Sequence, residues 1–151
     1  MTPKTAVIIG ASHAAAQLTA SLRQEGWDGD IVVVGDEGYL PYQHPPLSKT
    51  FLSGDKTVAD CSLYPSDYFD RQGVELLSGR KVVAIRPDAA EVALSNGDVI
   101  TYDKLLLTPG AEPHRLRAPG SNLANVLTLR SAADGLALAS SLGTGFRLVI
   151  V

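Results

Sequence analysis

The first 35 residues contain two short apolar runs joined by a glycine turn and a helical pattern, and this unit constrains the fold more than any other feature. The segment TAVIIG at 5–10 is apolar, rich in β-branched residues and ends in Gly, which is typical of a buried parallel strand. From His13 to Gln24, apolar residues recur at helical spacing, and DIVVVG at 30–35 is a second buried strand. A strand, a helix and a strand within about 30 residues predict a right-handed βαβ unit.

Further strand patterns indicate that the sheet continues and that an antiparallel meander accompanies it. VELLSG at 74–79 and KLLLTPG at 104–110 have the apolar, glycine-terminated pattern of buried strands. Between them, KVVAIRP, EVALS and VITY alternate apolar and polar residues, and the turn signal Asn96-Gly97 separates the last two. The predicted fold class is therefore α/β, with a parallel βαβ sheet and an antiparallel β-meander.

Helix signals and one more strand signal lie outside this sheet. A proline-rich passage at 41–46 forbids regular structure until a short helix can begin after it. Ser66 and Ser131 stand at the N-cap positions of two further helices. The expected segments are a short helix from about Leu47, helices over 65–73 and 131–142, and a strand over 146–151.

Composition and charge narrow the function classes. With 151 residues the chain has room for one domain with a sizeable core. The net charge of −3 offers no basic field for nucleic acid or anionic lipid, and apolar runs such as AVII are too short to span a bilayer. Cys61 is the only cysteine, which excludes an intrachain disulfide and a Cys-rich metal site. These features predict a cytoplasmic protein with no metal site and no nucleic-acid or membrane partner.

The turn between the first strand and the first helix has the chemistry of a diphosphate-binding loop. Gly10, Ser12 and Ala15 occupy the three slots of a G-x-G-x-x-G pattern, and small residues there let the backbone approach a phosphate. Free N–H groups and the positive end of the helix dipole favour an anion at the helix start. An acid is expected about 20 residues later to hold a ribose. Asp36 lies 21 residues after Ala15, with Glu37 beside it.

Longer stretches of the sequence resemble one group of flavoproteins. The group is the FAD-dependent ferredoxin reductases of the pyridine nucleotide–disulfide oxidoreductase superfamily, which include putidaredoxin and rubredoxin reductases. The similar stretches are GASHAAAQ, SLRQEGWDGDIVVVGDEGYLPYQHPPLSK, TYDKLLLTPGA and LTLRSAAD, so the resemblance covers the whole chain. PYQHPPLSK is the most specific of these pieces, because neither composition nor periodicity would produce it.

The resemblance implies a fold, a cofactor and a reaction. The fold is a Rossmann-like FAD-binding domain, incomplete in this chain. The whole protein would be an oxidoreductase that takes electrons from NAD(P)H through FAD and passes them to a ferredoxin-type iron–sulfur protein. The isolated fragment is expected to be inactive. The chain has no Cys-x4-Cys pair after the first helix, which excludes electron transfer to a protein disulfide within it.

The resemblance also implies roles for individual residues. The small residues at 10–14 would surround the pyrophosphate, Val82 would offer its backbone to the adenine, and Lys49 would lie near the flavin ring as the catalytic residue. A lysine there would stabilise negative charge on the ring. His44 and Pro109 stand where the family usually has Arg and Thr, so a guanidinium and a backbone N–H are lost at these positions. The implied cofactor-binding residues are Gly10, Ala11, Ser12, His13, Ala14, Asp36, Glu37, Lys49, Val82, Gly110 and Arg130.

The same resemblance implies how the chain divides. Residues 1–115 would form the first segment of the FAD-binding domain, and residues 116–145 the connection and helix toward an NAD domain. Residues 146–151 would form the first strand of that NAD-binding domain, truncated here. An unpaired apolar strand edge at this point would favour self-association.

Other function classes remain open on the sequence alone. One is a non-catalytic flavin- or nucleotide-binding module. Another is an NAD-dependent dehydrogenase domain, which the acid after the second strand permits. The βαβ unit by itself also fits a doubly wound domain that binds no nucleotide. The sequence does not discriminate NADH from NADPH and does not identify an electron acceptor or an oligomeric state.

Overall fold

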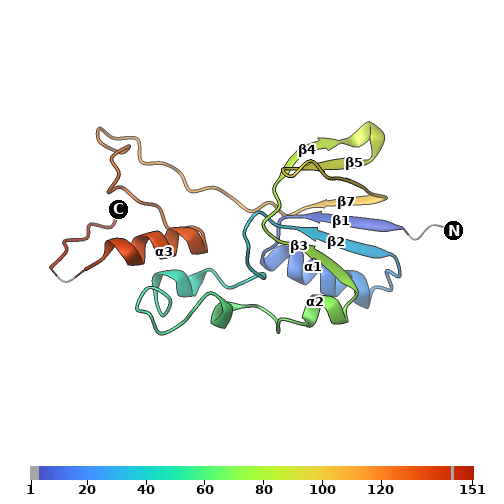
Figure 1. The fold of residues 1–151 in the computed structure, drawn as a ribbon, viewed down its shortest axis with the longest axis horizontal. Helices are drawn as coiled ribbons and strands as arrows, with labels where there is room; N and C mark the ends of the chain where they lie inside the picture. The colour runs from blue at the N-terminus through green and yellow to red at the C-terminus, as the bar shows by residue number, and fades with distance from the viewer. Residues whose placement is uncertain (1–3, 144) are drawn as a thin grey trace. The chain divides into compact units, whose positions relative to one another are not determined.

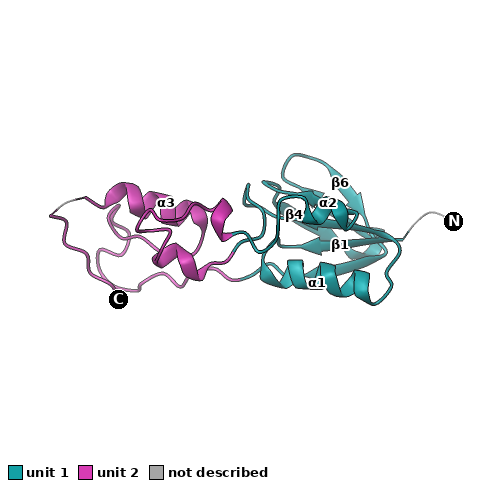
Figure 2. Ribbon diagram, turned by 90° about the horizontal axis from the view of Figure 1, so that it is seen from below, with its two compact units in different colours: residues 1–42, 62–110 teal, residues 43–61, 111–151 magenta. Residues whose placement is uncertain are grey.

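A computed structural model describes residues 4–143 and 145–151, and the chain forms two compact units (Figures 1 and 2). The first unit, teal in Figure 2, comprises residues 1–42 and 62–110 and contains both β-sheets. The second unit, magenta in Figure 2, comprises residues 43–61 and 111–151. Each unit is therefore built from two separate stretches of the chain.

A parallel sheet of four strands forms the centre of the first unit. Its strands are β1 Thr5–Ile9, β2 Asp30–Val34, β3 Val74–Leu77 and β7 Lys104–Leu107, in the spatial order β3-β2-β1-β7. All three pairings are parallel, which confirms the predicted βαβ sheet. Ile9 stands in register with Val34 on one side and with Leu107 on the other, so the carboxyl ends of β1, β2 and β7 are level.

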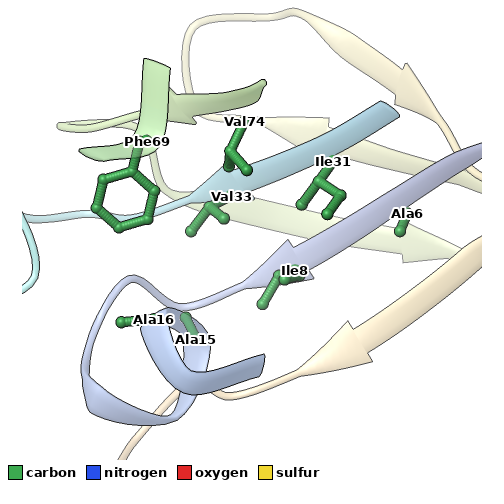
Figure 3. Packing of buried hydrophobic residues seen from close by; sticks show 8 residues of the cluster. All are labelled: Ala6, Ile8, Ala15, Ala16, Ile31, Val33, Phe69 and Val74. Carbon is green, nitrogen blue, oxygen red and sulfur yellow. The ribbon is translucent and has the colours of Figure 1, made fainter. Parts of the chain in front are cut away.

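Helix α1, His13–Gln24, covers one face of this sheet (Figure 1). Alternate residues of β1 and β2 point toward it, because successive side chains of a strand face opposite sides. Figure 3 shows these side chains beside two alanines of α1 and a phenylalanine of the short helix α2, Tyr68–Arg71. The buried cluster on this face comprises Ala6, Ile8, Ala15, Ala16, Ile31, Val33, Phe69 and Val74.

The antiparallel meander packs on the other face of the parallel sheet. Its strands are β4 Val82–Arg86, β5 Glu91–Leu94 and β6 Val99–Thr101, in the order β4-β5-β6, as the alternation predicted. Val7, Val32 and Val34 of the parallel sheet form a buried cluster with Val92 and Leu94 of β5. The parallel strands are thus covered on both faces, which explains why they read as continuous apolar runs.

The second unit contains helix α3, Ala132–Ser141, with two 3₁₀ helices, η1 Pro45–Ser48 and η2 Ala59–Cys61. Gly135 of α3 lies against the ring of Phe51, where a Cβ atom would come within 2.7 Å of the ring edge. α3 therefore approaches the η1 region closely because Gly135 has no side chain. The expected short helix after the prolines is present, but it begins at Pro45 rather than near Leu47, because proline suits the first turn of a helix.

The helix expected over 65–73 is shorter than predicted. α2 covers only Tyr68–Arg71, and Asp67 rather than Ser66 occupies its N-cap position. The Tyr68 N–H donates to the Pro65 carbonyl oxygen at 3.0 Å, so residues 65–68 close a turn instead of starting a helix. At the other end Gly73 has a φ of +60°, which ends the helical conformation.

The strand expected over 146–151 is wrong for this structure. These residues form no strand, and their apolar side chains are exposed, from 55% for Leu148 to 100% for Val151. A strand needs hydrogen bonds from a neighbouring strand, and none of the described strands pairs with this segment. The assignment of 1–115, 116–145 and 146–151 to parts of two domains stays a prediction.

One guanidinium joins three segments at the amino-terminal end of β2 and β3. Arg23, in the last turn of α1, donates from Nε to the Gln72 carbonyl oxygen and from Nη2 to that of Gly73, both at 2.8 Å. Its Nη1 donates to the carbonyl oxygens of Trp27 and Gly29, again at 2.8 Å. These bonds connect the end of α1, the loop before β2 and the turn before β3. Arg is suited to this role because its planar fork carries five donors.

We predict that Arg23→Lys lowers the free energy of unfolding by about 3 kcal/mol, because an ammonium group cannot reproduce the forked contacts and leaves carbonyl oxygens unpaired. Urea unfolding of the purified chain measures the change. The matched control is Arg71→Lys, whose exposed pair with Asp67 at 3.2 Å is expected to contribute less than about 1 kcal/mol. Equal losses in the two variants would contradict the structural role of Arg23.

A capping box starts α3, as Ser131 predicted. The Ser131 hydroxyl accepts from the Asp134 N–H at 3.2 Å, and the Asp134 carboxylate accepts from the N–H groups of Ser131 and Arg130, both at 2.9 Å. Partial burial by itself raises the pKa of the Asp134 carboxyl, but the hydrogen bonds from Ser131 and Arg130 outweigh it, and the pKa is lowered from 3.8. The helix start therefore favours the ionised form of this side chain.

We predict that Asp134→Asn removes a pH-dependent part of the stability. A carboxyl with a lowered folded-state pKa contributes stability above its unfolded value, 3.8, and the contribution is lost as the pH falls through the folded value. The difference in unfolding free energy between the parent chain and Asp134→Asn, about 1 kcal/mol at neutral pH, should therefore shrink below about pH 4. Asp134→Glu keeps a capping carboxylate and should retain the pH dependence. A difference that does not change with pH would contradict the assignment.

Candidate functional site

The candidate site begins where the level carboxyl ends of β1 and β2 meet the start of α1. Gly10 follows β1 directly and has a φ of +99°, a conformation that residues with side chains adopt only under strain. The Gly10 N–H donates to the Val34 carbonyl oxygen at 2.8 Å, which continues the pairing of β1 with β2 into the turn. The chain then turns at Ala11 and Ser12 and enters the helix at His13.

Two glycines keep this turn compact. A Cβ atom on Gly10 would overlap the carbonyl oxygen of Thr108, which follows β7. A Cβ atom on Gly35, which follows β2, would overlap the side chain of Ala11. The backbone at 10–12 is therefore packed between the ends of β7 and β2 at a distance that only glycine allows.

The first turn of α1 presents small side chains and backbone amides. Ser12 holds the N-cap position in an extended conformation, with φ −132° and ψ −157°, and within the described chain its side chain caps no helix amide. His13 and Ala14 are exposed, whereas Ala11 and Ser12 are half-buried. The positive end of the helix dipole lies here. The start of α1 thus combines the two properties that favour an anionic ligand, N–H groups without a partner within the helix and the positive end of the dipole.

The two acids after β2 differ in their contacts. Asp36 is exposed. Glu37 is half-buried, and its Oε2 accepts a hydrogen bond from the Tyr42 hydroxyl at 2.7 Å. The Glu37 carboxylate is therefore oriented by Tyr42, and the Asp36 carboxylate faces solvent at the end of β2.

The connection between β3 and β4 lies beside these acids. The Gly79 N–H donates to the Glu37 carbonyl oxygen at 2.9 Å, and the Arg80 N–H donates to that of Gly35 at 2.8 Å. Val82 begins β4 two residues later and is half-buried. Val82 and the acids are thus brought to one end of the parallel sheet, although the chain separates them by more than forty residues.

The predicted site residues fall into both compact units. The first unit holds Gly10, Ala11, Ser12, His13, Ala14, Asp36, Glu37, Val82 and Gly110. The second unit holds Lys49 and Arg130. Lys49 is exposed at the end of η1, where its N–H donates to the Pro46 carbonyl oxygen at 2.9 Å. Arg130 is half-buried and donates from Nε to the Ala111 carbonyl oxygen at 3.0 Å.

The sequence reasoning missed three residues that shape the turn and the acids. The sequence pattern identifies Gly35 only as the end of a strand, although a glycine directly after a buried strand can also signal a close backbone approach. Tyr42 orients Glu37, and no pattern in the sequence predicts that contact. The single hydroxyl proton of Thr108 is shared between the carbonyl oxygens of Ile9 and Gly10, which lie 3.0 and 3.1 Å from its oxygen.

Among residues 4–143 and 145–151, no group of three or more His, Cys, Asp and Glu side chains is arranged to hold a metal ion. Over the same residues, no helix is both long enough and apolar enough to cross a bilayer. Cys61 is buried as a free thiol.

The chain was compared with known proteins. It is 41% identical over 145 residues to rhodocoxin reductase of Rhodococcus erythropolis, covering 96% of this chain and 34% of the relative. It is 34% identical over 148 residues to putidaredoxin reductase CamA of Pseudomonas putida, covering 96% of this chain and 35% of the relative. The crystal structure of the ferredoxin reductase for the CYP199A2 system from Rhodopseudomonas palustris has a TM-score of 0.84 and 36% identity, covering 91% of this chain and 34% of that one.

These similarities concern a part of longer proteins, because the chain spans about a third of the length of the relatives that it matches. The profile of the family described as pyridine nucleotide-disulphide oxidoreductase matches residues 4–151. That match includes the β1–α1 turn, both acids after β2 and the meander. The chain belongs to the pyridine nucleotide–disulphide oxidoreductase family.

Proposed function

We propose that the chain forms the first part of the FAD-binding domain of an NAD(P)H-dependent oxidoreductase. In this proposal the whole protein passes electrons to a ferredoxin-type iron–sulfur protein. Its relatives include proteins named putidaredoxin reductase and rubredoxin-NAD(+) reductase, and a solved neighbour is a complex of putidaredoxin reductase with putidaredoxin. Because the chain spans about a third of such proteins, it would contribute cofactor binding to the reaction.

The observation that carries the proposal is the compact turn at the start of α1. Gly10 packs against the Thr108 backbone and Gly35 against Ala11, so the start of α1 is flanked by the small residues Ala11, Ser12 and Ala14. The backbone N–H groups that follow Gly10 at the start of α1, together with the helix dipole, suit a diphosphate. Asp36, exposed at the end of β2, would accept hydrogen bonds from the adenosine ribose. The residues present therefore fit the adenosine diphosphate part of FAD.

The residues of the second unit would serve the other half of the cofactor. When bound, the flavin would supply hydride and single-electron chemistry, which protein side chains do not provide. Lys49 carries an exposed ammonium group after a proline-rich 3₁₀ helix, and its charge would stabilise negative charge near the ring. Arg130, tied to the Ala111 carbonyl oxygen, would contact the cofactor from the segment before α3.

Three further assignments belong to this proposal. Val82, at the start of β4, would offer its backbone to the adenine, since the preceding segment already pairs with Gly35 and Glu37. Gly110 would border the cofactor after β7. We also propose a cytoplasmic location, which the single free cysteine supports. We predict that the protein has no nucleic-acid or membrane partner. We also predict self-association through the exposed apolar residues at 146–151.

We predict that the chain binds FAD more tightly than NAD. The proposed ribose and diphosphate contacts would serve either nucleotide, but Lys49 is proposed to stabilise charge on the flavin ring, which NAD lacks. The relatives are also named ferredoxin or rubredoxin reductases rather than simple dehydrogenases. Titration of the purified chain with FAD, followed by quenching of flavin fluorescence, gives one affinity, and competition by NAD gives the other. Tighter binding of NAD, or no binding of FAD, would overturn the proposal.

We predict that Asp36→Asn weakens FAD binding about tenfold, because a charge-assisted hydrogen bond to a ribose hydroxyl becomes a neutral one. The matched control is Asp28→Asn, which removes the same charge from an exposed residue before β2, at the opposite end of the strand. The control should bind FAD as the parent chain does. Equal affinities of both variants would remove Asp36 from the ribose site.

A further inference from the structure

Thr108 makes hydrogen bonds to the backbone that leads into the β1–α1 turn. It follows β7, and its N–H donates to the Ile9 carbonyl oxygen at 2.8 Å, extending the β1–β7 pairing by one step. Its hydroxyl lies 3.0 Å from the same oxygen and 3.1 Å from the carbonyl oxygen of Gly10. Since the Ile9 oxygen already accepts the Thr108 N–H, the single hydroxyl proton can serve the Gly10 oxygen, and Thr108 then contacts both carbonyl groups that lead into the turn.

The Gly10 carbonyl group determines where the next amide points. In a trans peptide the C=O group and the following N–H point in opposite directions. A hydrogen bond that holds the Gly10 oxygen toward Thr108 therefore fixes the direction of the Ala11 N–H. Gly10 needs this restraint more than other residues, because without a Cβ atom its backbone populates many conformations.

The neighbours of Thr108 reinforce the restraint. Its carbonyl oxygen lies where a Cβ atom of Gly10 would be, so the two backbones touch. On the other side of the turn, after β2, Gly35 packs against Ala11. Pro109 follows Thr108 and disfavours a helical backbone at the residue before it, which keeps Thr108 extended beside β1. The hydroxyl is therefore held at the turn by its own backbone.

We propose that Thr108 is a positioning residue for the diphosphate site: its hydroxyl orients the Gly10–Ala11 peptide so that the Ala11 N–H is preset to donate to a phosphate oxygen. The role rests on the proposed binding of FAD. Pro109, the next residue, has no N–H to donate to a ligand, so in this proposal the 108–109 segment acts on the diphosphate site through the Thr108 hydroxyl. The role also accounts for a hydroxyl placed beside two carbonyl groups of one turn.

The test compares three variants of the purified chain. Thr108→Val keeps the shape and removes the hydroxyl, and Thr108→Ser restores it. Thr19→Val is the matched control, because the buried Thr19 hydroxyl also donates to a backbone carbonyl oxygen, that of Ala15 at 2.8 Å, but within α1 and away from the turn. Urea unfolding measures stability, and FAD titration at a temperature where each variant is folded measures affinity.

Both valine variants should lose similar stability, since each loses one hydroxyl hydrogen bond. Only Thr108→Val should weaken FAD binding, by about tenfold, while Thr108→Ser should bind within about twofold of the parent chain. Amide hydrogen exchange adds a readout without FAD: the Gly10 amide, which is bonded to the Val34 carbonyl oxygen, should exchange faster in Thr108→Val and at the parent rate in Thr19→Val.

The outcomes separate the two proposals. If Thr108→Val binds FAD as the parent chain does, the positioning role is overturned and the FAD site stands. If the parent chain binds no FAD, both are overturned. If both valine variants weaken FAD binding equally, the effect is one of general stability and the positioning role is overturned. Should Thr108→Val fail to fold, Thr108→Ala takes its place under the same criteria.

Discussion

The contact between Gly10 and the backbone of Thr108 is the constraint on which the arrangement of the first unit depends. A side chain at position 10 would occupy the space of the Thr108 carbonyl oxygen, so β7 lies against β1 at this level only because residue 10 is glycine. The same glycine turns the chain from β1 into α1 with a positive φ. One residue thereby joins the edge strand, the central strand and the helix start.

The packing around that turn explains the character of the strands. β1 is buried on both faces, because α1 and α2 cover one side of the parallel sheet and the meander covers the other. Ala6, Val7 and Ile8 are fully buried in consecutive positions, which requires a side chain of low polarity at each. Arg23 then connects α1 to the loops at the opposite end of the sheet. The helix is thus held at both ends, by the glycine turn and by its last arginine.

Different parts of this architecture supply different groups to the candidate site. The turn supplies backbone donors, and the adjoining strand end supplies an acid whose neighbour is held by Tyr42. Membership of the pyridine nucleotide–disulphide oxidoreductase family agrees with such an arrangement. Lys49 and Arg130 lie in the second unit, so their proposed contacts with the same cofactor depend on how that unit is placed in the whole protein.

The sequence by itself determined the elements whose signals are local. The β-branched runs, the helical spacing from His13 to Gln24 and the Asn96-Gly97 turn predicted the sheet, α1 and the meander, because periodicity and turn chemistry act within a few residues. The glycine motif and the spacing of 21 residues from Ala15 to Asp36 also predicted a nucleotide site from the sequence alone. The prediction was wrong where a local pattern lacked its partner: the residues at 146–151 look like a strand, but no described strand pairs with them.

Only the tertiary structure decided which distant residues complete the turn. Thr108 contacts Gly10 across 98 positions of the chain, and Gly35 leaves room for the side chain of Ala11. These contacts depend on strand order and register, which bring the ends of β2, β1 and β7 level. Strand order follows from how the whole sheet buries its two faces, and that is a property of the folded chain rather than of any stretch of residues within it.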